Sequence, residues 1–357
     1  MKGDCGVTYL DRRSFLKVTG SSALVAGFSP LASAQAPGKI RFVGSAAVPR
    51  ADQGFMFAGI PTGIYKQLNV EADFVTVAGS AASIQLVLGR QAQLAHVGML
   101  ELLAAKHKNP NLPVQAVYLH DIISAYEIVV AEDSAIKSIA ELKDKKVGVI
   151  SLASGAILTV KAMLHQANVS PDSVELLPVG AGAQALAALR GDRVQALALF
   201  RGSHVAIENL GVKLRYFTPR VPSSVLAAHT DDIANKRMDL VHALQGVVMN
   251  SLYMQTNPEA GVRAYYELFG KPSGDPDKAM RDNVHLIKKS AELWKQPGSP
   301  GPYGAMNDKT WIDMLDFIGP SFEFDRSKLG TVYTADLIAD VNKVDLKRAV
   351  ELAKAAK

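Results

Sequence analysis

Two segments of the chain share one residue pattern and lie about a hundred residues apart. The segments read VAGSAASIQLVLGRQAQLAHVG at residues 77–98 and VGAGAQALAALRGDRVQALALF at residues 179–200, and a constant offset of 102 residues aligns Gly89 with Gly191. Each segment contains a turn of small residues, a short apolar helix, a glycine, a polar step with Gln and an apolar strand. A unit that occurs only twice does not form a solenoid. It predicts two similar α/β lobes that face each other.

The first 34 residues have the features of an export signal. Arg12 and Arg13 precede a short apolar run at residues 21–28, and the run is followed by Ala32-Ser33-Ala34. This order is typical of a secretory signal, and the paired arginines favour the twin-arginine export machinery. We therefore expect cleavage near Ala34 and a periplasmic mature protein.

Composition excludes several classes of function. Removal of residues 1–34 lowers the net charge from +5 to +3, because four basic and two acidic residues are lost, and no basic tract for nucleic acid remains. The only cysteine, Cys5, lies in the removed segment, so the mature chain has no disulfide and no cysteine nucleophile. The eight histidines are scattered, and no G-x-S-x-G or H-E-x-x-H motif is present. We expect no enzyme activity, no metal and no cofactor.

Strand and helix patterns alternate from residue 39 to residue 221, which predicts mostly parallel sheets with crossover helices. Beyond residue 231 nearly every pattern is helical, which predicts a helical C-terminal extension. The strands expected are 40–44, 70–77, 93–97, 114–120, 127–131, 146–150, 174–179, 194–200, 213–217 and 225–229. The helices expected are 55–68, 81–88, 99–106, 156–166, 183–189, one from Ser203, 238–256, 258–269, 276–294, 307–318 and 345–354.

Small residues fill the loops that join strands to helices. In parallel α/β sheets these loops carry the ligand site, and the unpaired N–H groups and dipole at each helix N-terminus favour an anion. The loops concerned are residues 78–80, 98–99, 152–155, 180–182 and 201–203.

Arg201 and four aromatic side chains are further candidates for this site. Arg201 directly follows a predicted strand, where its guanidinium could pair with an anionic ligand; the alternative is a surface arginine on a loop. Phe55, Phe57, Tyr126 and Phe200 could line the cleft, although each taken alone fits the core better; Tyr126 stands where the chain should pass between the lobes, which favours the cleft.

The chain resembles the periplasmic solute-binding proteins of ABC importers that serve sulfonates, nitrate, taurine and thiamine-precursor pyrimidines. The resemblance rests on VTVAGSAA at residues 75–82, GRQAQLAHVG at residues 89–98 and IAELKDKKVGV at residues 139–149, with shorter matches at 151–156, 177–183 and Tyr333-Thr334. It implies a type II two-lobe clamp, with lobe I formed by 37–125 plus 222–357 and lobe II by 126–221. It also implies chain crossings near 125–126 and 220–222, a monomer, a small-molecule solute and a membrane permease as partner.

The resemblance and the loops together define an expected solute site. Its residues are Ser45, Phe57, Gly79, Ser80, Ala81, Gly98, Met99, Tyr126, Ser154, Gly155, Ala156, Gly182, Phe200 and Arg201. The two tryptophans of the mature chain, Trp294 and Trp311, both fall in the helical extension, which favours a small organic anion over a stacked pyrimidine. A pyrimidine ligand, an enzyme on the same scaffold and a sensor that reports to a membrane receptor are the alternatives.

Overall fold

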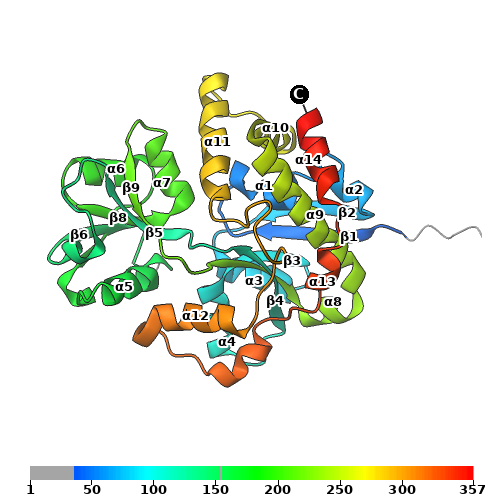
Figure 1. Cartoon of the computed structure of the whole chain (residues 1–357), viewed down its shortest axis with the longest axis horizontal. Coiled ribbons are helices and arrows are strands. Elements are labelled where there is room, and N and C mark those ends of the chain that lie inside the picture. Colours follow the sequence, from blue (N-terminus) through cyan, green and yellow to red (C-terminus); the bar gives the residue numbers. More distant parts are fainter. Residues whose placement is uncertain (1–35, 153–154, 357) are drawn as a thin grey trace, which may run out of the picture. The chain divides into compact units, whose positions relative to one another are not determined.

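Two five-stranded sheets organise the part of the chain that the computed structural model describes, residues 36–152 and 155–356 (Figure 1). The first sheet has the order β2-β1-β3-β10-β4 and the second has the order β7-β6-β8-β5-β9. The strands of the first sheet are β1 (Gly38–Gly44), β2 (Val70–Thr76), β3 (Leu94–Gly98), β4 (Val114–Asp121) and β10 (Ser224–His229). Those of the second are β5 (Tyr126–Ala131), β6 (Lys146–Val149), β7 (Glu175–Pro178), β8 (Ala196–Phe200) and β9 (Leu214–Phe217).

The two sheets have the same topology. In the first sheet β1 pairs in parallel with β2 and β3, while β10 is antiparallel to both β3 and β4. In the second sheet β6 pairs in parallel with β7 and β8, while β5 is antiparallel to both β8 and β9. Four of the five strands in each sheet therefore run in one direction, which confirms the predicted α/β class with mostly parallel sheets.

The chain passes between the sheets twice. It leaves the first sheet between Asp121 and Tyr126 and returns between Phe217 and Ser224. These two segments lie side by side, because Ser124 N–H donates to the carbonyl of Pro219 at 3.3 Å. Since Pro37–Lys357 forms one compact unit, the division into lobes 37–125 plus 222–357 and 126–221 stays a prediction.

The repeated segments form equivalent units in the two sheets. The first is α3 (Ser80–Leu88) with β3, and the second is α6 (Ala183–Arg190) with β8. The glutamine of each unit makes the same contact at the same position: Gln93 Oε1 accepts the N–H of Arg41 at 2.9 Å, and Gln195 Oε1 accepts the N–H of Lys146 at 3.0 Å. Each glutamine thereby joins its own strand to the neighbouring strand of the sheet, so the sequence repeat is also a structural repeat.

The first long helix expected from the sequence, 55–68, is wrong. The structure has two short helices there, α1 (Gly54–Phe57) and α2 (Ile64–Gln67). Pro61 lacks the N–H that a continuous helix needs, and Gly63 has a φ of 74°, which leaves the helical region. A 3-10 turn at Ala51–Gln53 precedes α1.

The remaining helices agree with the sequence pattern to within a few residues, except that the pattern did not include α8 and α13. Asn257 and Asp275 cap helices that begin at Pro258 and Pro276, because their side chains accept N–H groups of the first helical turns. The helices between strands are α4 (Met99–Lys108), α5 (Ala156–Gln166) and α7 (Arg201–Glu208). The C-terminal helices are α8 (Thr230–Asn235), α9 (Arg237–Thr256), α10 (Pro258–Phe269), α11 (Pro276–Ala291), α12 (Asp308–Ile318), α13 (Ile338–Val341) and α14 (Leu346–Ala355).

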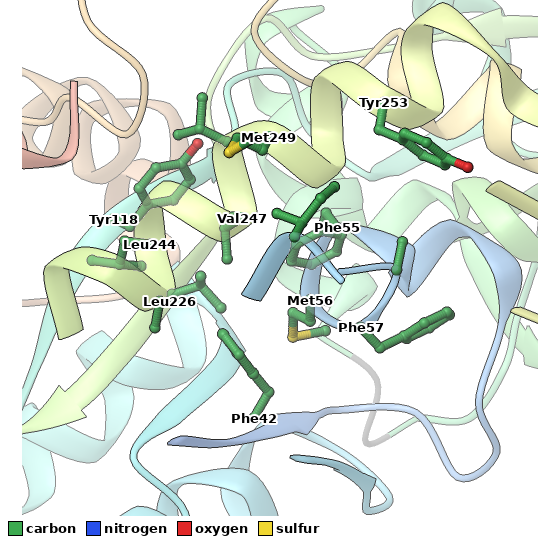
Figure 2. Packing of buried hydrophobic residues seen from close by; sticks show 14 of the residues in the cluster. Phe42, Phe55, Met56, Phe57, Tyr118, Leu226, Leu244, Val247, Met249 and Tyr253 are labelled. Carbon is green, nitrogen blue, oxygen red and sulfur yellow. The ribbon is translucent and has the colours of Figure 1, made fainter. Parts of the chain in front are cut away.

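Apolar side chains cover both faces of the first sheet. Phe42 and Leu226 point into a cluster with Leu244 and Val247 of α9 (Figure 2). Their strand neighbours, such as Val43, belong to a second cluster on the opposite face. Burial on both faces explains the nearly continuous apolar strands in the sequence.

No helix among residues 36–152 and 155–356 has both the length and the apolarity needed to cross a bilayer. The predicted signal peptide, residues 1–34, lies outside the described residues.

Candidate functional site

A cavity of about 590 Å³ is lined by residues of both sheets and of the C-terminal helices. The first sheet contributes the loop after β1, the loop after β2 and the end of β4. The second contributes the start of β5 and the joint between β8 and α7. The lining residues used below are Ser45, Arg50, Asp52, Phe55, Gly79, Ser80, His96, Gly98, His120, Asp121, Tyr126, Phe200, Arg201, Gly202, Ser224, Ser290 and Trp294.

The N-terminus of α3 reaches the cavity through Gly79 and Ser80. Gly79 has a φ of 87°, which glycine tolerates well, and this turn brings the chain from β2 into α3. The Ser80 hydroxyl accepts the N–H of Gly98 at 3.0 Å, which joins the two strand-end loops. The N-cap residue, Gly79, has no side chain with which to cap this helix. The first N–H groups of the helix have no intrahelical partner and carry the positive end of the helix dipole.

The N-terminus of α7 reaches the same cavity from the second sheet. Phe200 ends β8 and is the N-cap residue, and Arg201 and Gly202 form the first turn. The N–H of Arg201 donates to the carbonyl of Ala125 at 2.8 Å. The apolar N-cap residue, Phe200, does not cap α7 with its side chain either, so two helix ends that favour negative charge line one cavity.

Arg50 is a cation at the cavity with one nitrogen that no described residue accepts from. Its Nε and Nη2 donate to the carboxylate of Asp52 at 2.9 and 2.8 Å, and Asp52 also accepts from Ser290 Oγ at 3.1 Å. Its guanidinium lies 4.9 Å from the ring centroid of Phe200, which belongs to the other sheet. Among the described residues, Nη1 of Arg50 has no hydrogen-bond partner, so this nitrogen remains available to a ligand.

Arg201 also lines the cavity, but other protein groups occupy most of its donors. Nε and Nη2 donate to Glu127 at 2.6 and 2.8 Å, and Nη1 donates to the Lys289 carbonyl at 2.9 Å and to Glu292 at 2.8 Å. Burial alone would raise the pKa of Glu127. Hydrogen bonds from His204 and Arg201 instead hold this pKa below its usual value. Arg201 therefore ties the second sheet to the end of α11.

Four rings form one aromatic wall of the cavity. His120 stacks on Phe55 with 3.5 Å between ring centroids, and His96 and Trp294 approach Phe55 edge-on at 5.2 and 5.8 Å. Burial, together with the positive charge of Arg50, lowers the pKa of His96 to about 4. Burial lowers the pKa of His120 well below its ordinary value. Both imidazoles are therefore neutral at pH 7, and the wall can receive a flat, unsaturated solute.

Tyr126 stands at the start of β5, where the chain enters the second sheet. Its hydroxyl donates to Glu101 of α4 at 3.5 Å. The negative charge of Glu101, with burial, raises the pKa of Tyr126, and burial raises the pKa of Glu101. This contact links the two sheets at the edge of the cavity.

Seven of the expected site residues line the cavity: Ser45, Gly79, Ser80, Gly98, Tyr126, Phe200 and Arg201. Six do not: Phe57, Ala81, Met99, Gly155, Ala156 and Gly182. Ser154 lies outside the described residues.

Phe57 and Met99 are core residues in the structure. The ring of Phe57 is fully buried, 5.1 Å from the rings of both Phe74 and Phe269. Met99 is also fully buried. Ala81 is exposed on the second residue of α3. Ala81 and Met99 directly follow the cavity residues Ser80 and Gly98 in the sequence, and Phe57 lies two residues after Phe55, but none of the three lines the cavity.

Sequence reasoning missed Arg50, Asp52, His96, His120, Asp121 and Trp294 as cavity residues. Phe55, considered only as a candidate, does line the cavity. Arg50 and Asp52 lie in the turn after β1, where an Arg-x-Asp sequence could have been noticed. Trp294 follows α11 in the helical extension, and no local pattern indicates that tertiary packing brings it to the strand ends.

No group of three or more His, Cys, Asp or Glu side chains in the described ranges is placed to hold a metal ion. The polar groups that line the cavity include Arg50, Arg201, the two helix ends, the two imidazoles and the carboxylates of Asp52 and Asp121.

A match to a family model shows which protein family the chain belongs to. The model of the family described as "NMT1/THI5 like" matches residues 51–260, more than half of the 357 residues. The chain belongs to the NMT1/THI5-like family. No curated protein matches it.

Solved structures of other proteins share the fold of this NMT1/THI5-like chain. The periplasmic aliphatic sulphonate binding protein SsuA from Escherichia coli is 15% identical with a TM-score of 0.62, over 84% of this chain and 93% of that one. The alkanesulfonate-binding protein SsuA from Xanthomonas axonopodis pv. citri, bound to MOPS, is 14% identical with a TM-score of 0.58, over 84% and 99%. The periplasmic nitrate-binding protein NrtA from Synechocystis PCC 6803 is 11% identical with a TM-score of 0.56, over 90% and 99%.

The predicted resemblance and fold class are thereby confirmed. This NMT1/THI5-like chain has the fold of the periplasmic binding proteins: two open, mixed sheets flanked by helices, with a helical C-terminal region.

Proposed function

We propose that the protein is the solute-binding component of an ABC importer and that it holds a small organic anion in this cavity. One observation carries the proposal: two uncapped helix N-termini, from α3 and α7, line the same cavity as the free Nη1 of Arg50. The helix ends belong to different sheets, so a solute that contacts both would hold them together. The fold relatives named for sulphonate and nitrate binding support the same class of ligand.

The size and the rings of the cavity favour an anion with an organic body. A volume of about 590 Å³ is far more than nitrate requires and lies in the range of ordinary small-molecule sites. The wall of Phe55, His120 and Trp294 offers aromatic surface to the body of the solute. We therefore propose a carboxylate or sulfonate that carries an unsaturated ring.

The same wall supports a second candidate ligand, an uncharged heteroaromatic ring such as a pyrimidine. Trp294 falls in the helical extension, which counted against stacking, and its position on the cavity wall removes that argument. The two candidates differ in charge, because a neutral ring would use the wall and the imidazoles and would need neither Arg50 nor the helix ends.

Export and partners complete the proposal. The signal at residues 1–34, cleaved near Ala34, would direct the protein through the twin-arginine machinery to the periplasm. There the protein would act as a monomer and deliver its solute to a permease in the inner membrane. The absence of cysteine after Cys5 argues against an enzyme with a cysteine nucleophile on this scaffold.

Isothermal titration of the mature protein tests the ligand class. Benzoate, benzenesulfonate, nitrate and neutral 4-aminopyrimidine form a panel in which charge and ring vary separately. We expect the two aromatic acids to bind with one site each and nitrate to bind more weakly. Binding of the pyrimidine alone would favour the second candidate, and a new product detected by mass spectrometry would favour an enzyme.

A further inference from the structure

Asp121 is a buried carboxylate at the cavity. It ends β4, its side chain is 9% exposed, and it lines the cavity next to the crossing into the second sheet. Oδ2 accepts from the Ser224 hydroxyl at 2.6 Å, which links β4 to β10. Oδ1 accepts no hydrogen bond from any side chain in the part of the chain that the structure describes.

The cations near Asp121 are bonded to other carboxylates. Arg50 makes its two-point contact with Asp52, and Arg201 makes its contacts with Glu127 and Glu292. Among the described residues, no lysine or arginine forms an ion pair with Asp121. The nearest titratable nitrogen is Nε2 of His120, at 3.8 Å from Oδ1, and that imidazole is neutral at pH 7.

The pKa of Asp121 is that of a buried carboxylate without a cationic partner. Burial raises it to about 7, and the charge of Asp52 adds to that effect. The Ser224 hydrogen bond and the more distant Arg201 and Arg50 charges lower it only in part. A carboxylate that is buried without a cation is costly, and an added positive charge would stabilise its ionised form.

We propose that Asp121 is the subsite for a cationic nitrogen and that the solute is a zwitterion with an aromatic body. The anionic group of the solute binds at Arg50 and the helix ends, its ring packs on Phe55 and Trp294, and its ammonium group donates to Asp121. This inference rests on the proposed function, because it assumes the anion site. It adds a second polar contact, between the cationic nitrogen of the solute and Asp121, to the contact of the anionic group with Arg50.

Matched probe acids test the proposal directly. The compounds are 3- and 4-(aminomethyl)benzoate, the corresponding 3- and 4-(hydroxymethyl)benzoates, and benzoate. Each aminomethyl compound differs from its hydroxymethyl partner only in the charged nitrogen. At about pH 8, where Asp121 is ionised, we expect at least one aminomethyl isomer to bind about tenfold or more tightly than its partner, the size of one charged hydrogen bond.

Two variants test whether Asp121 causes the preference for the aminomethyl acid. Asp121→Asn should bring the two dissociation constants of the pair to within about twofold of each other, since the amide cannot carry the charge. Asp73→Asn is the matched control, because Asp73 lies on β2, is half-exposed and pairs with Arg41 on the surface; its ratio should stay that of the wild type. Circular dichroism checks that both variants fold.

A second measurement uses the wild type alone. Lowering the pH from about 8 to about 6 protonates Asp121, whose pKa is about 7, so the preference for the aminomethyl acid should fall while the amine stays charged. This result does not depend on the folding of Asp121→Asn.

Each outcome has a clear meaning. Equal binding of amino and hydroxyl partners, or a preference that survives in Asp121→Asn, overturns the zwitterion inference and leaves the anion site standing. If neither benzoate nor any derivative binds, the aromatic-anion function fails, and the inference fails with it.

Discussion

Glu127 accepts two hydrogen bonds from the guanidinium of Arg201, at 2.6 and 2.8 Å, and both side chains are almost completely buried. The same guanidinium reaches Glu292 at the end of α11. Arg201 was expected to grip the solute, and the structure instead gives it an extensive set of protein partners. Its role in solute binding stays a prediction, to be separated by experiment from its role in stability.

Arg201→Met should lower the free energy of unfolding by about 3–5 kcal/mol, because it removes the guanidinium that pairs with the buried carboxylate of Glu127. Urea denaturation followed by circular dichroism measures the change. Lys39→Met is the control, since the Lys39–Glu71 pair is largely exposed at 3.8 Å and should contribute less than about 1 kcal/mol. Equal effects in both variants would contradict a structural role for Arg201.

Arg50→Gln should weaken binding of the tightest aromatic acid by about 10–100-fold, the range for a hydrogen bond to a charged group. Isothermal titration gives the dissociation constants. Arg41→Gln serves as control, because Arg41 pairs with Asp73 on the surface, away from the cavity lining. If Arg201→Ala weakens binding more than Arg50→Gln does, Arg201 is the principal anion ligand, as the sequence suggested.

His96→Phe should change how stability depends on pH. In the wild type the unfolded chain takes up a proton near the ordinary imidazole pKa of 6.5, whereas native His96 does so only at about 4. Stability therefore falls as the pH is lowered from 6.5 towards 4, by about 1.4 kcal/mol per pH unit for this one group. Denaturation curves across that range should lose this contribution in the variant. Phe55→Leu, in the same ring cluster, should lower stability and keep the slope.

Gln93→Ala should destabilise the protein by about 1 kcal/mol, because it removes one hydrogen bond, to the N–H of Arg41. Gln195→Ala should destabilise it by more, because it removes the equivalent bond to Lys146 and also two bonds from Nε2 to Asp192. The double variant should show the sum of the two single losses, since the two sites share no partner. Equal losses, measured by urea denaturation, would mean that the Asp192 contacts contribute nothing to stability.

Gly246→Ala should destabilise the core although alanine favours a helix. A Cβ at Gly246 of α9 would lie 2.2 Å from Cε1 of Tyr65, and Tyr65 is held by hydrogen bonds to Met56 and Asn250. Overpacking of this kind costs about 1–3 kcal/mol, more than the gain of about 1 kcal/mol in helix propensity. Gly261→Ala of α10 is the control, since its Cβ would meet the flexible Met254 at 3.1 Å. A rise in melting temperature for Gly246→Ala would refute the expectation.

The strands and most helices could be predicted because each depends on the pattern of residues that are neighbours in the sequence. All ten expected strands occur, since period and Gly or Pro boundaries are properties of neighbouring residues. The helix predicted over residues 55–68 is the exception, because Pro61 and Gly63 interrupt an apolar helical pattern. The strand order and the antiparallel insertion of β10 and β5 depend on contacts between distant segments, which a single sequence does not display.

The site could be predicted only in part. Loops such as Gly79-Ser80 were found because strand-to-helix joints are visible in the sequence. Partners distant in sequence were not found: Glu127 lies 74 residues from Arg201, and Trp294 reaches Phe55 across most of the chain. Arg50 was overlooked because it lies in the loop directly before the short 3-10 turn at Ala51–Gln53, where no pattern of small residues marks a site.

The two tryptophans provide an intrinsic optical reporter. Trp294 lines the cavity, whereas Trp311 is fully buried in α12 against Tyr333. A solute that enters should quench or shift the fluorescence of Trp294 and leave the emission of Trp311 constant. The unmodified protein can thus follow its own occupancy in a cuvette, with an internal reference in the same spectrum.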